Sequence, residues 1–211
     1  MSQFAKPTGL FGRILAKGMA WGHRDFYKNT VKVLDLKHDD KYLEIGFGSG
    51  LFIKKYASHV NRIAGLDCSE DMVNLASSIN ENLIKSGRAE FRQGNVSSLP
   101  WENEEFSAVV GIETFFFWSE PVASLKEIYR VLAPGGRLII EMAYNKDDGL
   151  DHTKHIKKMN LKLYSADEME NMFKESGFSD IFITYYRAFR VPFKGYAVPK
   201  GMIVKGVKKT G

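Results

Sequence analysis

The sequence predicts an α/β fold, in which helices cover both faces of a mostly parallel sheet. Short apolar runs alternate with helix-like segments after the first forty residues, the order that builds parallel sheets through crossover helices. A glycine-rich turn follows the first apolar run. The last two apolar runs follow each other without a helix, which indicates a hairpin. The expected sheet has seven strands, with one antiparallel strand at its edge.

The expected elements follow in a regular order. Strands are predicted at 41–45, 61–67, 89–93, 106–112, 137–143, 179–189 and 200–209. Helices are predicted at 49–60, 70–87, 121–136 and 165–178. Pro121 near the start of one helix, and Gly135 near its end, match the usual asymmetry of helix termini. Ser69 is a candidate N-cap, and Gly177 a candidate stop for the last helix.

Composition indicates a globular protein. The chain has 211 residues, of which 44% are hydrophobic, so we expect residues 1–211 to form a single domain. The net charge of +5 comes from dispersed basic residues, which favours a solvated surface over a nucleic-acid interface. No apolar run of membrane-spanning length or secretory signal is seen, and Cys68 is the single cysteine. These features predict a cytoplasmic location and no transmembrane segment.

The segment YLEIGFGSG, residues 42–50, carries three glycines at alternate positions: Gly46, Gly48 and Gly50. A glycine-rich turn between a strand and a helix is typical of sites for nucleotide-bearing cofactors. The third glycine comes one position earlier than in the dinucleotide fingerprint. The spacing therefore favours close approach of a ligand to the backbone over pyrophosphate binding.

Carboxylates flank this turn. Glu44 could accept hydrogen bonds from a ligand's ammonium group, or it could be a strand-end residue satisfied by loop amides. Asp67 ends the second strand, where an open parallel sheet places the acid that holds ribose hydroxyls. It could also belong to the N-cap region of the next helix.

Asn95 lies in the loop after the third strand. Its amide both donates and accepts, so it could bind an adenine edge, although a Gly-Asn pair is also a common turn.

Four motifs in register carry a family resemblance: YLEIGFGSG, IAGLDCSEDMVNLA, GNVSSLPWENEEFSAVV and LKEIYRVLAPGGRLII. Over about residues 40–142 the chain resembles the class I S-adenosylmethionine-dependent methyltransferases. Within that class it is similar to the small-molecule branch that includes the ubiquinone and menaquinone methyltransferases. The resemblance implies a Rossmann-like sheet and S-adenosylmethionine as cofactor, with S-adenosylhomocysteine as product.

The resemblance also implies roles for the matching residues. The methionine and ribose portions of the cofactor would be cradled by Gly46, Phe47, Gly48 and Gly50. Glu44 would help to orient the amino group, and Asp67 would bind the ribose hydroxyls. The adenine would be contacted by Cys68, Met72, Asn95 and Val96. Ile112 and Glu113 would face the methionine part or the acceptor. The family usually has Asp at the position of Asn95, so we expect somewhat weaker binding.

Methyl transfer needs alignment and a dry site more than a catalytic dyad. A general base helps where the acceptor is an oxygen or nitrogen acid. The candidates are Glu113, Tyr144, His152 and His155, and Glu113 is best placed because it follows the fourth strand. The two histidines lie in a polar insertion, where we expect them to be exposed and not to bind a metal.

Three segments have open interpretations. Residues 1–30 mix apolar and basic positions and are expected to form a lid, with Trp21 and Tyr27 reaching inside. Residues 145–163 form an insertion near the acceptor side. The aromatic run at 115–118 could line an acceptor pocket or pack in the core.

The leading hypothesis is methyl transfer to a small molecule. RNA or protein methylation is an alternative, although the fourth strand lacks the Asn/Asp-Pro-Pro-aromatic signature and no nucleic-acid module is visible. A noncatalytic cofactor-binding scaffold is a further alternative, while the glycine spacing argues against a nicotinamide-dependent oxidoreductase.

Overall fold

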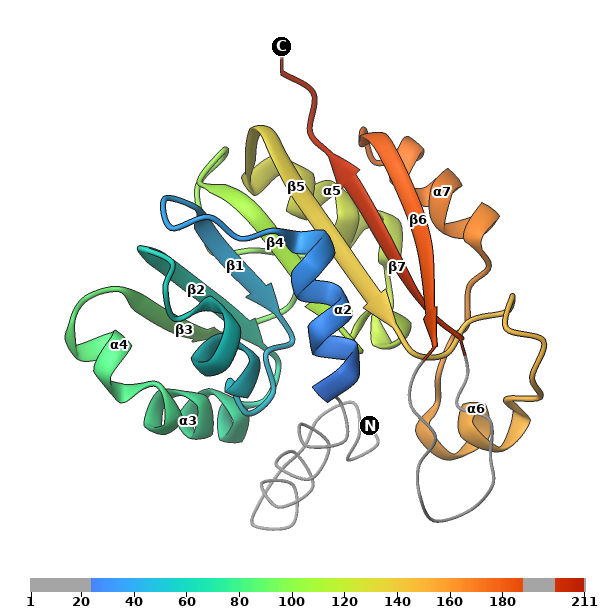
Figure 1. The fold of residues 1–211 in the computed structure, drawn as a ribbon, viewed down its shortest axis with the longest axis horizontal. Helices are drawn as coiled ribbons and strands as arrows, with labels where there is room; N and C mark the ends of the chain where they lie inside the picture. Colours follow the sequence, from blue (N-terminus) through green and yellow to red (C-terminus); the bar gives the residue numbers. More distant parts are fainter. Residues whose placement is uncertain (1–23, 188–199, 211) are drawn as a thin grey trace.

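The computed structural model describes residues 24–187 and 200–210, which form a seven-stranded sheet (Figure 1). The strand order is β3-β2-β1-β4-β5-β7-β6. The strands are β1 (Lys41–Ile45), β2 (Arg62–Asp67), β3 (Ala89–Gln93), β4 (Phe106–Ile112), β5 (Leu132–Met142), β6 (Ser179–Arg187) and β7 (Lys200–Val207).

The sheet is parallel from β3 to β5, and β7 is antiparallel to both of its neighbours. The predicted fold class is confirmed. The reversed strand β7 lies between β5 and the edge strand β6, so β6 points the same way as the parallel strands. The carboxyl ends of β1, β2 and β4 therefore meet at one edge of the sheet, where ligands bind in open parallel sheets.

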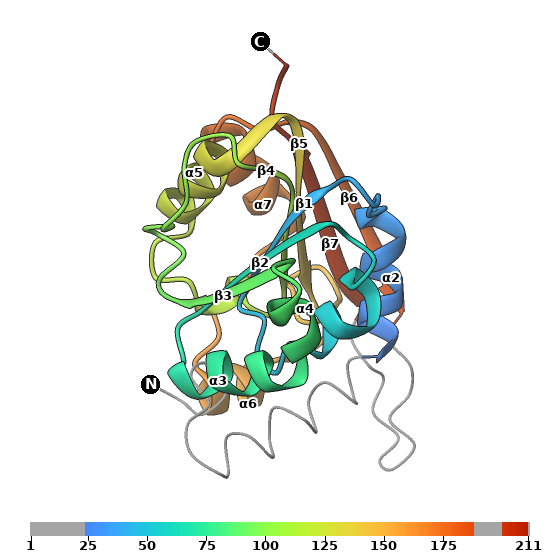
Figure 2. The same ribbon diagram turned by 90° about the vertical axis from the view of Figure 1, so that its left-hand side faces the viewer.

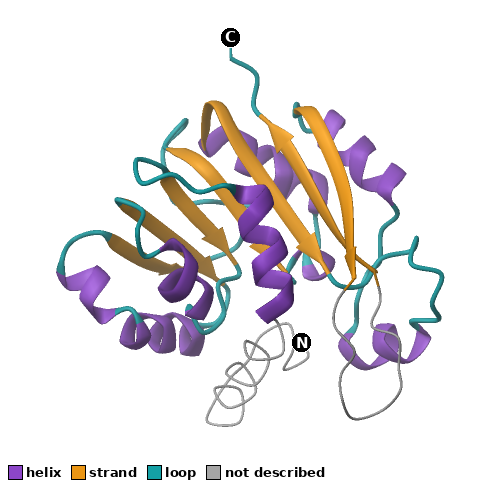
Figure 3. Ribbon diagram, in the orientation of Figure 1, coloured by secondary structure: helices purple, strands orange, loops and turns teal. Residues whose placement is uncertain are grey.

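Helices cover both faces of the sheet (Figures 2 and 3). One face carries α2 (Arg24–Leu34), the short π-helix η1 (Ile53–Ala57), α3 (Glu70–Ile79) and α4 (Glu81–Lys85). The other carries α5 (Pro121–Val131) and α7 (Ala166–Glu175). The 3-10 turn η2 (Phe115–Phe117) follows β4, and α6 (Thr153–Met159) lies beyond the end of β5.

The helix predicted at 70–87 is interrupted at Asn80, which separates α3 from α4. The Asn80 amide donates to the carbonyls of Ala76 at 3.0 Å and Gly50 at 3.1 Å. The interruption thus fixes the end of α3 to the glycine-rich turn. The helix predicted at 165–178 begins at a capping box in which Ser165 and Glu168 satisfy each other's backbone amides, which is why its start was readable from sequence.

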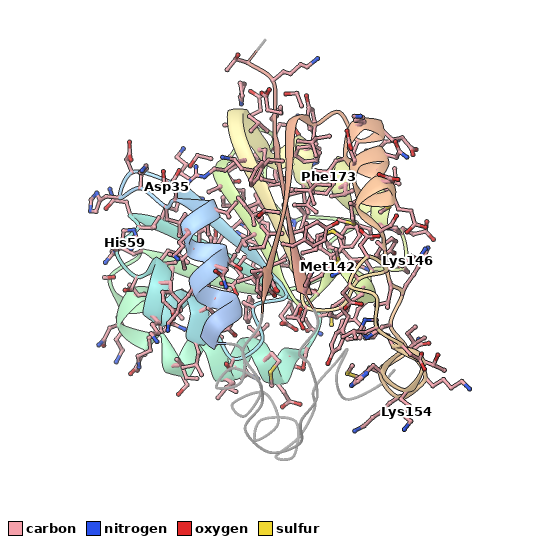
Figure 4. The ribbon with its side chains drawn as sticks, turned by 45° about the vertical axis from the view of Figure 1, so that its right-hand side comes forward. Asp35, His59, Met142, Lys146, Lys154 and Phe173 are labelled. Atoms are coloured by element: carbon pink, nitrogen blue, oxygen red, sulfur yellow. The ribbon has the colours of Figure 1, made fainter. Side chains whose placement is uncertain are left out.

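Two apolar cores stabilise the layers, one on each face of the sheet. Met142 and Phe173, labelled in Figure 4, are both fully buried in the core under α5 and α7. The core on the face covered by α2, called the α2 core below, differs because acidic and phenolic side chains are buried there: Glu44, Glu141, Tyr42 and Tyr186. Among the described residues, no helix is long and apolar enough to cross a membrane.

Arg137 holds the end of α2 against the sheet. Its guanidinium donates to the Asp40 carboxylate at 2.6 Å and to the Leu34 carbonyl at 2.7 Å. A forked contact of this kind fixes orientation as well as distance. It sets where α2 crosses the sheet, and so where Tyr27 lies.

Candidate functional site

Three loops meet at the carboxyl ends of β1, β2 and β3. The Gly46 amide donates to the Leu66 carbonyl at 2.7 Å, and the Gly48 amide donates to Asp67 Oδ2 at 2.9 Å. The Gly94 amide donates to the Asp67 carbonyl at 3.0 Å. The turn after β1 is therefore tied to β2, and the loop after β3 is tied to the same residue.

The three glycines of the turn have different reasons to be glycine, although all three have positive φ. A Cβ at Gly46 would lie 2.5 Å from Thr114 Oγ1, and one at Gly50 would lie 2.8 Å from the Ala76 Cβ. A Cβ at Gly48 would meet no atom within 4 Å. The protein itself thus excludes side chains at Gly46 and Gly50, and only Gly48 of the three presents backbone to open space.

Asp67 lies beside this open space and is 7% exposed. Its Oδ1 accepts from the Ser69 amide at 2.9 Å, in addition to the Gly48 contact through Oδ2. Asp67 therefore supports the start of α3, as the N-cap interpretation predicts, and it also contacts the glycine turn; its binding of ribose hydroxyls stays a prediction. A carboxylate has about four lone-pair sites and can accept several hydrogen bonds at once.

Glu44 is 3% exposed, and its Oε2 accepts from the Tyr42 hydroxyl at 2.9 Å. Its partner is thus a phenol on the same face of β1, not the loop amides considered from sequence. Burial, together with the charge of Asp67, raises the pKa of Glu44 to about 8. A nearby cation would favour its ionised form.

The residues expected around the adenine differ in how exposed their side chains are. Cys68 is exposed, whereas Met72 is fully buried among the side chains of the α2 core. We therefore leave Met72 out of the proposed site, because its side chain fills the core beneath the loops. Phe47 is also mostly buried and packs against Phe91 with ring centroids 5.1 Å apart, so its backbone is the part that borders the turn.

Asn95 is exposed, and its Oδ1 accepts from the Ser97 amide at 3.1 Å. The side chain thus has the turn role considered from sequence, and its contact with adenine stays a prediction. Val96 is 8% exposed and packs into the core under α5.

Glu113 follows β4 with a φ of +56°, an unusual conformation for a residue other than glycine. Its Oε1 accepts from the Ala143 amide at the end of β5, and its own amide donates to the Glu141 carbonyl at 3.0 Å. Burial raises the pKa of Glu113 to about 7. Ile112, just before it, is 8% exposed and lies opposite Glu141 in the sheet.

Glu141 and Tyr186 were not identified from sequence. Glu141 is fully buried, and its Oε1 accepts from the Tyr186 hydroxyl. Burial, together with the charge of Glu113, raises the pKa of Glu141 well above its usual range. An acid inside the apolar run at 137–143 was a signal that could have found Glu141. Tyr186 reaches it only because β6 and β7 fold back onto β5.

Tyr27 of α2 faces this acidic region. Its ring centroid lies 5.1 Å from that of Phe52. Burial raises the pKa of Tyr27, and the charges of Glu44, Glu141 and Glu113 raise it further. Trp21, the other residue expected to reach inside, lies outside the described residues.

The aromatic run after β4 packs mainly in the core. Phe115, Phe116 and Trp118 are at most 7% exposed, and Phe117 is partly buried against the same core. The core interpretation therefore accounts for most of the run. The acceptor-pocket interpretation stays a prediction for Phe117.

The insertion at 145–163 contains one buried and one exposed histidine. His152 is 6% exposed, with Nε2 2.8 Å from both carboxylate oxygens of Asp148, so the expectation that it is exposed is wrong. His155 is exposed and stacks on Tyr144 at 5.0 Å. Lys154 points outward from α6 (Figure 4). Within 24–187 and 200–210, no three His, Cys, Asp or Glu residues are grouped to hold a metal ion.

The fold and the loops define a class: a doubly covered α/β sheet with an open glycine turn and an acid at the end of β2. A family model described as a methyltransferase domain matches residues 43–140. YdaC of Bacillus subtilis, an uncharacterized methyltransferase, is 28% identical over 159 residues, covering 74% of this chain and 81% of that protein. The demethylmenaquinone methyltransferase of Thermotoga maritima is 32% identical over 141 residues, covering 65% of this chain and 57% of that protein.

Solved structures share the fold. A complex of the Haloferax volcanii Trm112 methyltransferase activator with a methyltransferase has a TM-score of 0.82 at 20% identity, covering 94% of this chain and 95% of that one. Phosphoethanolamine N-methyltransferase 2 of Haemonchus contortus, with bound S-adenosylhomocysteine, has a TM-score of 0.78 at 17% identity, covering 94% of this chain and 58% of that one. The chain belongs to the class I S-adenosylmethionine-dependent methyltransferases, and S-adenosylmethionine is its cofactor.

Proposed function

We propose that the chain transfers the methyl group of S-adenosylmethionine to a small molecule at the carboxyl ends of β1, β2 and β4. The observation that carries this proposal is the open space in front of Gly48, beside the Asp67 carboxylate. A ligand with paired hydroxyl groups fits this combination, because the backbone allows close approach and the carboxylate accepts hydrogen bonds.

The residues present fit the cofactor. Asp67 would accept from the ribose hydroxyls, while the backbone at Gly48 would border the ribose and the methionine part. Cys68 and Asn95 are exposed on the loops after β2 and β3, on the side proposed for the adenine. Glu44 is buried and its pKa is raised, so the positive amino group of the cofactor would stabilise its ionised form.

The cofactor supplies a methyl group that is already activated by its sulfonium, so the protein's contribution is alignment, exclusion of water and proton transfer. Glu113 is the candidate proton acceptor. It sits at the end of β4 with one oxygen anchored to the Ala143 amide, and its pKa of about 7 lies near the optimum for a general base. His152 is held by Asp148 and is a second candidate.

A small-molecule acceptor is supported by the resemblance to the demethylmenaquinone methyltransferase and by the dispersed basic charge of the sequence. The alternative is a macromolecular acceptor, RNA or protein. The structural relative forms a complex with the Trm112 activator, so a protein partner is included in the test. The first hypothesis predicts that the purified chain alone methylates small molecules, and the alternative predicts that it does not.

Calorimetric titration with S-adenosylmethionine, S-adenosylhomocysteine and NAD tests the cofactor site. We expect micromolar binding of the first two and none of NAD. Binding of NAD alone would contradict the proposal. Acceptors are then screened through the release of S-adenosylhomocysteine, with and without an added Trm112-type activator. Turnover that needs both the activator and RNA or protein would favour the alternative.

A further inference from the structure

Three glutamates lie at neighbouring strand ends, and none of them has a basic partner among residues 24–187 and 200–210. Glu44, Glu113 and Glu141 lie at the ends of β1, β4 and β5, and Glu44 and Glu141 are on the face covered by α2. The ion pairs among the described residues involve other carboxylates and none of these three. A buried acid without a basic partner is costly to ionise. A positively charged ligand would stabilise the ionised carboxylates and would therefore bind favourably here.

Glu141 gives an independent indication of a ligand. Its Oε1 accepts from the Tyr186 hydroxyl, but its Oε2 is buried and has no hydrogen-bond partner in the part of the chain that the structure describes. Leaving such an oxygen unsatisfied destabilises a folded protein, and such groups are uncommon. Glu113, whose backbone amide donates to the Glu141 carbonyl, is partly exposed.

Within the described part of the chain, the titratable groups that face Glu113 and Glu141 are phenols, which supply no positive charge. Tyr27 from α2, Tyr186 from β6 and Tyr144 after β5 all have raised pKa values, chiefly through burial and with Glu113 among the causes. These phenols are therefore neutral at ordinary pH, and they can donate or accept hydrogen bonds without offsetting the acids.

We propose that Glu113 and Glu141 form a carboxyl pair that binds the ammonium group of an amine, and that the methyl acceptor is therefore a basic amine. This inference rests on the proposed function and narrows its acceptor. A phenolate or carboxylate acceptor would be repelled by the same groups, whereas an ammonium group supplies the donors and the charge that the pair lacks.

The pair also provides a destination for the proton. An ammonium nitrogen has no lone pair, so one N–H bond must break before the nitrogen can accept a methyl group. The proton adds to a Glu113 oxygen, the electron pair stays on nitrogen, and Glu113 later returns the proton to solvent. Charge and atoms balance, because a cationic amine and a carboxylate become a neutral amine and a carboxylic acid.

The test uses the full chain saturated with S-adenosylhomocysteine and labelled with ¹³C at the glutamate carboxyl carbons. The resonances are assigned with Glu113→Gln and Glu141→Gln. The titration of the pair is then followed with pH in ethylammonium chloride and in sodium chloride of equal ionic strength. We expect ethylammonium to lower the pKa of the pair in the wild type, because a bound cation favours the ionised form. An unchanged titration would overturn the inference.

Matched variants separate the possible outcomes. Glu141→Gln should weaken ethylammonium binding at least about tenfold, as expected when a charged hydrogen-bond partner worth about 1.5–3 kcal/mol is lost. Glu175→Gln, the same change at an exposed position on α7, should match the wild type. Equal ethylammonium affinity in Glu141→Gln would overturn the inference.

Affinity for S-adenosylhomocysteine distinguishes this inference from the proposed function. It should be unchanged in Glu141→Gln, and a tenfold loss would assign the pair to the cofactor and overturn the amine site. Failure of the wild-type chain to bind S-adenosylhomocysteine would instead count against the proposed function itself.

Discussion

The open space at Gly48 can be tested with a single methyl group. Gly48→Ala adds a Cβ that would meet no atom of residues 24–187 or 200–210 within 4 Å, so among these residues only the backbone φ of +52° opposes the change. Gly87→Ala is a matched control. Gly87 has a φ of +72° and an equally open Cβ position, but it lies between α4 and β3, away from the proposed site.

The two changes should cost similar stability. A left-handed conformation costs a non-glycine residue about 1–2 kcal/mol, partly offset by about 0.4–1 kcal/mol from a less flexible unfolded chain. A net loss of about 1 kcal/mol lowers the melting temperature of a chain of this size by about 2–4 °C. In Gly48→Ala the methyl group should also overlap a bound cofactor. Overpacking of this kind costs about 1–3 kcal/mol, so the affinity for S-adenosylhomocysteine should fall roughly tenfold or more.

Thermal unfolding measures the first effect, and calorimetric titration with S-adenosylhomocysteine measures the second. We expect similar melting temperatures for the two variants and a loss of affinity confined to Gly48→Ala. If Gly48→Ala binds S-adenosylhomocysteine as tightly as Gly87→Ala does, the cofactor does not pass this turn and the placement of the site is refuted.

Three further changes test individual residues. Asp67→Ala should weaken S-adenosylhomocysteine binding about 100-fold in the same calorimetric titration, because two charge-assisted hydrogen bonds of about 1.5 kcal/mol each are lost. An unchanged dissociation constant would show that Asp67 does not bind the ribose. Asn95→Asp should preserve or tighten binding, because a carboxylate keeps the bond from the Ser97 amide at 3.1 Å, and a large loss in the same titration would show another role. Glu44, whose folded pKa is raised to about 8, contributes stability that is fully present below its unfolded pKa of about 4.5 and is lost as pH rises through about 8. Urea unfolding of Glu44→Gln should therefore depend less on pH between about 5 and 8 than that of the wild type, and equal slopes would contradict the raised pKa.

Much of the fold was predictable because its signals are local. The apolar runs fixed the strands, and the capping box at Ser165 marked the start of α7. The break at Asn80 was not predictable, because the helical periodicity continues through it. It depends on a hydrogen bond to the Gly50 carbonyl, thirty residues away in the chain.

The loops of the candidate site were also predictable, but the reasons for their residues were not. Three alternate glycines suggested close approach of a ligand to all of them. The structure shows that Thr114 fills the space at Gly46 and that Ala76 fills the space at Gly50. Likewise, the family resemblance implied that Met72 contacts the adenine, whereas in the structure its side chain is fully buried in the core.

The sequence by itself determined the α/β class, the strand order along the chain and the positions of Gly48 and Asp67, because periodicity and turn residues act over a few neighbours. Only the tertiary structure decided that Tyr186 meets Glu141 and that Glu113 lies beside it. These contacts join strands that are far apart in the chain. The raised pKa values follow from burial, which depends on the whole packed structure and not on any local pattern.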